Sequence, residues 1–357
     1  MPSALLSLSP LDGRYAGRLD ALRPHLSEYA LLRHRVAVTE PDWKRRMNLL
    51  LELDELEQAA SVMYIHAPPL VATTGHAGTE QLIAQFPAAF RERSPELAFL
   101  RGLTGWTRWD FAGMHASLAQ AVAGFEAAGD RGRAQLAQGF LVHALLPLGR
   151  IEEAAAQVAA LRSQALSEPA KVMLLNAEIW LAIESCRHSA VAPLLAEMLG
   201  RLESVQRPEL WFHTTPPLRM PGLPGVTPVL ARHAQLLQRI GGDSATPLRA
   251  LGLLSEAWCA LWQGRIEDAR SLVAEARADA RWSGQSGAVR AHLASLDDNG
   301  LARWRRANVG FVFQQFHLLP YLTATLSGSL LDTWLVIVGI ILVVVIVVLP
   351  SGIFGLV

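Results

Sequence analysis

The stretch LPLGRIEEAAAQVAAL, residues 146–161, decides the fold because it recurs as LWQGRIEDARSLVAEA at 261–276. Each copy joins two apolar, helix-like segments through a turn at the glycine, and apolar residues recur three and four positions apart on both sides. Acidic residues follow the turn, where the dipole of a beginning helix favours anions. This structural role accounts for the acidic residues of both copies without catalysis: Glu152, Glu153, Glu267 and Asp268.

Two weaker copies extend the repeat along the chain. They are centred on Phe111 in WDFAGMHASLAQAV and on Ser189 in RHSAVAPLLAEML, so the centres 111, 151, 189 and 266 are separated by 40, 38 and 77 residues. The last interval is close to twice the others, which sets the period near 39. The apolar pattern predicts two amphipathic helices in each unit. Since one pair cannot bury its own apolar stripe, the pairs must stack into a solenoid. A non-repetitive helical bundle is the alternative.

Local signals mark where helices begin and where the pattern breaks. Ser94 before Pro95, and Thr246 before Pro247, each combine a capping hydroxyl with a proline that suits the first helical turn. The stretch 209–228 is rich in proline and glycine and interrupts the repeat. It is either a loop or a distorted repeat unit.

Composition narrows the function classes. The 357 residues carry 32 basic and 32 acidic side chains, so we expect no direct nucleic-acid partner. Two cysteines suit a reducing compartment and no secretory signal opens the chain, which predicts that the bulk is cytoplasmic. Neither lysine, Lys44 or Lys171, follows a glycine, so the sequence contains no Walker A phosphate loop.

The histidines and tryptophans predict no ligand site. His66 and His76, or Cys186 and His188, lack the paired spacing of metal ligands, so we interpret the 11 histidines as isolated surface or capping residues and expect no metal or cofactor. Several tryptophans at helical positions are interpreted as solenoid core: Trp106, Trp180, Trp258 and Trp262.

Three stretches of the repeat region are distinctive: ASVMYIHAPPLVATTGHAGTEQLIAQFP (60–87), SPELAFLRGLTGWTRWDFAG (94–113) and FEAAGDRGRAQLAQGFLVHALLPLGRIEEA (125–154). With the spacing near 39, they make segment 41–293 similar to the helical-repeat, TPR-like region of MalT-like, LuxR-type transcriptional regulators. The solenoid of that family senses effectors or partner proteins. The resemblance implies an all-α solenoid whose concave face binds a protein partner or a small effector.

The run LSLSPLDGRYAGRLDALRPHLSEYALLRHRVAV, residues 6–38, resembles the N-terminus of adenylosuccinate lyase. By this resemblance Arg14 and Tyr15 would contact a nucleotide substrate. The lyase also needs a mobile serine loop containing Met-Pro-x-Lys-x-Asn-Pro, and neither lysine has such surroundings. We therefore expect no lyase chemistry.

The run ASLDDNGLARWRRANVGFVFQQFHLLPYLTA, residues 294–324, resembles the Q-loop segment of ABC-transporter ATPases. The resemblance implies that Gln314 would sense Mg²⁺ and the γ-phosphate. Phosphoryl transfer depends on positioning and charge neutralisation, which the missing Walker A lysine would supply. The segment is therefore expected to be a fragment without its active site.

The end of the chain is almost wholly apolar. Sixteen consecutive apolar residues fill 334–349, and no charge follows Asp332. Segment 332–357 resembles the last transmembrane helix of branched-chain amino-acid ABC permeases, and a span reaching past Pro350 is long enough to cross a ~30 Å hydrocarbon core. This predicts a C-terminal anchor in the bacterial inner membrane through 334–357, with a buried strand pair as the alternative.

These patterns divide the chain into segments 1–40, 41–293, 294–326 and 327–357. We expect a non-enzymatic helical-repeat protein, of regulatory or interaction type, with no catalytic residues. Two alternatives remain open. One is a chimeric or misassembled sequence with no single function, and the other is a membrane component associated with an ABC transporter.

Overall fold

The computed structural model describes residues 31–32, 34–205, 207–214, 223–242 and 246–278. Every regular element within these ranges is a helix, which confirms the predicted all-α class for this part of the chain. Contacts divide the chain into units 1–290 and 291–357, and the described helices all belong to the first.

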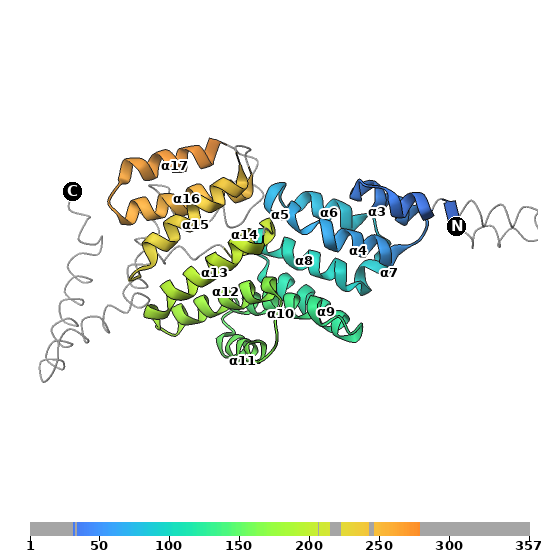
Figure 1. The fold of residues 1–357 in the computed structure, drawn as a ribbon, viewed down its shortest axis with the longest axis horizontal. Coiled ribbons are helices and arrows are strands. Elements are labelled where there is room, and N and C mark those ends of the chain that lie inside the picture. Colours follow the sequence, from blue (N-terminus) through green and yellow to red (C-terminus); the bar gives the residue numbers. More distant parts are fainter. Residues whose placement is uncertain (1–30, 33, 206, 215–222, 243–245, 279–357) are drawn as a thin grey trace, which may run out of the picture. The chain divides into compact units, whose positions relative to one another are not determined.

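Most helices follow one another in pairs (Figure 1). We name the first member of each pair the leading helix and the second the trailing helix. The leading helices are α8 (Pro95–Arg108), α10 (Arg131–Leu145), α12 (Glu168–Glu184), α14 (Pro208–His213) and α16 (Pro247–Trp262). The trailing helices are α9 (Phe111–Ala127), α11 (Ile151–Arg162), α13 (Val191–Val205), α15 (Val226–Gly241) and α17 (Ile266–Ala278). They are preceded by α3 (Trp43–Glu52), α4 (Leu56–His66), α5 (Pro68–Thr73), α6 (His76–Ala84) and α7 (Ala88–Arg93).

The turns between leading and trailing helices share a residue in the left-handed region of the backbone. Five such residues have φ between 57° and 75°: Trp109, Gly149, Cys186, Gly225 and Gly264. Successive positions are separated by 40, 37, 39 and 39 residues. This spacing matches the period near 39 expected from the sequence. Gly225 also marks a further unit in the middle of the 77-residue interval between the repeat centres at 189 and 266.

One backbone hydrogen bond closes the leading helix at four of these turns. The N–H of Arg150 donates to the carbonyl of Leu145 at 3.1 Å, five residues earlier. This is the Schellman motif, which satisfies carbonyls that a helix end would otherwise leave without a partner. The same five-residue bond joins Asp110 to Gly105, Arg187 to Ala182, Arg265 to Ala260 and, after α3, Glu55 to Leu50.

The two helices of a pair are buried to different degrees. Ten of the 15 residues of α10 are buried, but only three of the 12 in α11. The expectation of two amphipathic helices is therefore wrong for α10, because α9, α11 and α12 all pack against it. Helix α11 keeps the expected pattern, since its buried residues are Ala154, Val158 and Leu161.

The fourth pair is distorted. Its leading helix α14 has only six residues and packs against α5, α12 and α16 (Figure 1). Trp211, Phe212 and His213 are buried there, and Nε2 of His213 lies 3.4 Å from the Leu103 carbonyl oxygen in α8. Of the two interpretations of 209–228, the structure favours the distorted repeat, because this stretch holds most of a short leading helix and the start of α15.

Both predicted helix starts are confirmed. The hydroxyl of Ser94 accepts a hydrogen bond from the Leu97 N–H at 3.3 Å, with Pro95 in the first turn of α8. The hydroxyl of Thr246 accepts one from the Arg249 N–H at 3.2 Å at the start of α16. These caps fix where two leading helices begin.

None of the helices in the described ranges is long and apolar enough to span a membrane. The predicted membrane segment 334–357 lies outside those ranges, as do segments 294–326 and 1–30.

We expect opposite effects on the free energy of unfolding from adding a side chain at one turn and removing one at an equivalent turn. A Cβ at φ +72° is strained although nothing lies near it, so Gly149→Ala should lower the free energy of unfolding by about 1 kcal/mol. Cys186→Gly should raise it by up to about 1 kcal/mol, because Cys186 adopts φ 57° with a side chain. Urea denaturation measures both.

Gly200→Ala is the matched control. This glycine lies inside α13 in open space, so alanine should stabilise the helix by ~0.5–1 kcal/mol. If alanine at positions 149 and 200 changed stability in the same direction, the role assigned to the turn would be wrong.

Candidate functional site

A cleft lies between two neighbouring repeats, where one turn departs from the others. After Trp109, Gly149 and Gly264 the trailing helix begins two residues later. After Cys186 a 3₁₀ turn, η1 (His188–Ala190), intervenes, and α13 begins only at Val191. Helices α11 and α13 both pack on α12, and a cleft of about 200 Å³ opens beside all three.

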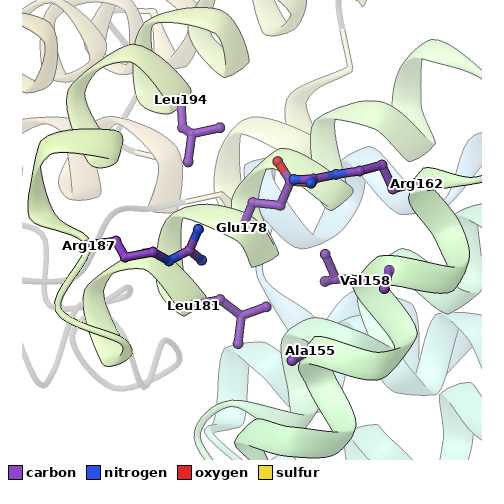
Figure 2. A pocket seen from close by; sticks show the side chains of 8 residues that line it. Ala155, Val158, Arg162, Glu178, Leu181, Arg187 and Leu194 are labelled. Atoms are coloured by element: carbon purple, nitrogen blue, oxygen red, sulfur yellow. The ribbon is translucent and has the colours of Figure 1, made fainter.

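Apolar side chains, which we call the floor, and charged side chains, which we call the rim, both line the cleft (Figure 2). Val158, Leu181 and Leu194 come from α11, α12 and α13 respectively. Val158 and Leu181 are almost fully covered by their neighbours, whereas Leu194 is partly exposed. The remaining lining residues are Ala155, Ala159, Arg162, Glu178 and Arg187.

Glu178 and Arg162 form an ion pair at the rim. Arg162 donates from Nε at 3.0 Å and from Nη2 at 2.6 Å, both to Oε1 of Glu178. The two partners are unequally solvated, because Glu178 is 8% exposed while the Arg162 side chain is 69% exposed. The arginine thus supplies the partner that a nearly buried carboxylate needs.

Arg187 reaches the cleft from the opposite side. Its Nε donates to the Ser185 hydroxyl at 3.0 Å, and within the described ranges its terminal guanidinium nitrogens have no protein partner. Figure 2 shows its guanidinium turned toward the space between Leu181 and Glu178. This group is therefore available to an anion that approaches the apolar floor.

The arrangement is suited to binding one apolar group beside one anion. Its volume of about 200 Å³ is below the ~300–1,000 Å³ typical of pockets that enclose drug-sized ligands. A side chain of a protein partner fits this space better than a whole small molecule does.

A second polar cluster lies in the core. The Nδ1 of His143 lies 2.9 Å from the amide nitrogen of Asn176, and the Trp106 ring centroid lies 4.5 Å from that of His143. The Nε2 of His143 and the indole Nε1 of Trp106 are buried without a hydrogen-bond partner in the described part of the chain. His213 is better satisfied, since its Nδ1 donates to the Glu209 carbonyl at 2.6 Å.

Burial sets the charge state of three core histidines. It lowers the pKa of His143 to about 3, with the nearby His213 contributing, and lowers the pKa of His213 and of His233 to about 4. These side chains are fully enclosed, so the interpretation of the histidines as surface or capping residues is wrong for all three. The reason is that neighbouring helices cover the sides of α10, α14 and α15 on which these histidines lie.

The tryptophans are buried to different degrees. Trp106 is 6% exposed and confirms the core interpretation, while Trp180 and Trp258 are partly buried. Trp262 is 47% exposed, so the prediction was wrong there, because this residue ends α16.

The residues singled out by family resemblance are not brought together. Arg14, Tyr15 and Gln314 lie outside the described residues. Within the described ranges, no three His, Cys, Asp or Glu residues are placed to hold a metal ion.

Sequence reasoning missed the cleft residues, although two signals pointed to them. Glu178 interrupts the apolar run VMLLNAEIWLAI, and a carboxylate in a buried helix requires a partner. The Gly-Arg-Ile run that precedes α11 and α17 is replaced before α13 by Cys186, Arg187 and His188, which marks an altered turn.

Comparison with known proteins gives a partial similarity to a lyase. The chain is 35% identical to adenylosuccinate lyase of Haemophilus influenzae over 95 residues, which are 27% of this chain and 18% of the lyase. No family model matches the chain, and no solved structure does. The chain thus spans under a fifth of that lyase, and the resemblances to regulators, ABC ATPases and permeases gain no support from these comparisons.

We expect the ion pair at the rim to respond unequally to the loss of either partner. Arg162→Ala leaves a nearly buried carboxylate unpaired and should lower the free energy of unfolding by ~1–3 kcal/mol. Glu178→Leu leaves an arginine that water already solvates, so its cost should be smaller, and Arg162→Ala should cost little in that background. Equal costs for the two single variants in urea denaturation would contradict this account.

Stability should fall as the pH drops below about 6.5. The three core histidines are neutral in the folded state, while the unfolded chain binds protons below its ordinary histidine pKa of ~6.5. Their contribution is complete above pH 6.5 and is lost toward pH 4, by up to ~1.4 kcal/mol per pH unit for each histidine. Urea denaturation at pH 7.5 and 5.5 should differ by about 4 kcal/mol.

His233→Phe tests this assignment. Both ring nitrogens of His233 are buried without a described partner, and its ring stacks 5.6 Å from Trp211, so phenylalanine fits the site. The variant should lose about a third of the pH dependence and be more stable than the wild type at pH 5.5. An unchanged pH dependence would show that His233 is not the titrating group.

Proposed function

We propose that the described helices form a TPR-like solenoid that acts as a non-enzymatic binding module. In this proposal, a segment of a protein partner docks in the cleft between α11 and α13. The observation that carries the proposal is the cleft itself, where Val158, Leu181 and Leu194 face an open space at a repeat boundary. Apolar side chains gathered in a cleft with a polar rim are typical of protein interaction sites.

The scaffold around the cleft supports this role. Helices α10, α11, α12 and α13 pack on one another, and their turns are closed by five-residue hydrogen bonds. A site presented by packed helices keeps its geometry before a partner arrives, which reduces the entropy lost on binding.

The cleft replaces the concave face as the proposed docking place. In the described ranges, α5 packs against α8 and α16, and α14 packs against α12 and α16. Another segment of the chain, α5, thus covers part of the leading helices α8 and α16. The size of the cleft also favours a protein segment over a small effector.

The composite organisation is a second proposal, which concerns the ends of the chain. The partial similarity to adenylosuccinate lyase supports a lyase-like origin for part of the chain. The division of contacts after Arg290 supports a junction near residue 293. The proposal assigns no activity to the segments outside the solenoid.

A peptide selection tests the binding module directly. Random linear peptides displayed on phage are selected on the full-length protein in mild detergent, and enriched peptides are synthesised for affinity measurement. We expect enriched peptides whose dissociation constant rises at least tenfold with Leu194→Arg, which places a charge on the apolar floor, and with Ala155→Trp, which fills the cleft.

Two controls keep the result interpretable. Far-ultraviolet circular dichroism shows whether each variant retains its helices. Gly200→Ala, on α13 but not among the cleft residues, should bind the same peptides as the wild type. If no enriched peptide depended on Leu194 or Ala155, the cleft would not be the binding site.

A further inference from the structure

The charge at the rim of the cleft is unbalanced. The carboxylate of Glu178 accepts both of its ion-pair bonds from Arg162, so these two charges offset one another. No carboxylate in the described ranges forms an ion pair with Arg187. The rim therefore carries one positive charge that the chain's own described residues do not neutralise.

The position of this charge relative to the apolar floor defines the ligand. Arg187 follows Cys186 at the turn, and its guanidinium is directed over Leu181, one of the apolar lining residues (Figure 2). An arginine binds a carboxylate through two parallel hydrogen bonds when geometry allows, and such pairs are stronger than neutral hydrogen bonds. A ligand that presents an aliphatic group and a carboxylate close together satisfies both parts of the cleft.

We propose that the cleft binds an acidic peptide segment, in which an aliphatic side chain enters the apolar floor and a neighbouring carboxylate pairs with Arg187. This inference rests on the proposed function and specifies the partner's chemistry. The carboxylate belongs to an aspartate or glutamate adjacent to a leucine, isoleucine or valine of the partner.

The chain itself offers a reporter at this site. Cys186 is exposed next to Arg187, while the other cysteine, Cys259, is buried, and burial raises the pKa of its thiol to about 11. Maleimide reagents react with accessible thiolates, so an environment-sensitive fluorophore should attach to Cys186 alone. A change in its emission on adding peptide then reports binding at the cleft.

The experiment compares enriched peptides with their neutral counterparts on the full-length protein. We expect the enriched peptides to carry an acidic residue beside an aliphatic one. Replacing that aspartate by asparagine, or glutamate by glutamine, should raise the dissociation constant ~10- to 100-fold. Arg187→Gln should weaken the acidic peptide by a similar factor and leave the neutral peptide almost unaffected. Replacing the aliphatic residue by alanine should also weaken binding.

A matched variant removes one positive charge elsewhere. Arg131→Gln, at the exposed start of α10, should leave the affinity unchanged, which separates a pair with Arg187 from general attraction to a cationic surface. Raising NaCl from about 50 to about 500 mM should weaken binding to the wild type more than binding to Arg187→Gln.

Two results would overturn the inference, and they are distinguishable. If peptides depended on Leu194 and Ala155 but not on Arg187, the binding module would stand and the acidic partner would be wrong. If no peptide depended on any cleft residue, the inference would fail together with the proposed function.

Discussion

The left-handed residue that closes α8, α10, α12 and α16 is the constraint on which the rest of the structure depends. It reverses the chain within a few residues, and the hydrogen bond from the next N–H holds that reversal in place. The trailing helix then packs along its leading helix, as α9 does on α8 and α17 on α16. The turn recurs at nearly constant spacing, although in the fourth unit α15 packs on α13 and α16 and α14 packs on α5, α12 and α16.

The cleft follows from a change in one of these turns. The turn at Cys186 keeps the left-handed residue and the five-residue hydrogen bond, but a 3₁₀ turn delays the trailing helix. The first residue after Arg187 is His188, where other units place Ile151 or Ile266. The result is an open space beside α12, bounded by an ion pair on one side and an arginine on the other. The modified turn at Cys186 is thus part of the repeat architecture and also shapes the cleft of the proposed function.

Part of this architecture was predictable from the sequence and part was not. Gly149 and Gly264 revealed the repeat because glycine adopts the left-handed conformation without strain. Trp109 and Cys186 adopt the same conformation with side chains, so residue identity alone does not show that these turns are equivalent. The period could still be recognised, because weaker copies of the apolar pattern survive in the trailing helices centred on 111 and 189.

Long-range packing explains what local patterns missed. His143 and His213, which are 70 positions apart, are buried because helices distant in the sequence meet around them. The pair of Arg162 and Glu178 joins neighbouring helices, so only the unusual carboxylate in an apolar run hinted at it. Arg187 gave no signal by itself, since exposed arginines are common. Its relevance depends on the cleft, which is a property of three helices together.

Amide hydrogen exchange at the turns tests the central claim most directly, namely that one closed turn per repeat organises the helices. The N–H groups of Arg150, Arg187 and Arg265 each donate to a carbonyl five residues earlier. The account predicts that these amides exchange far more slowly than in an unfolded peptide of the same sequence, and at similar rates in all three turns. Exchange at the unfolded rate would contradict it, because the repeats would then not be closed by the motif that defines them.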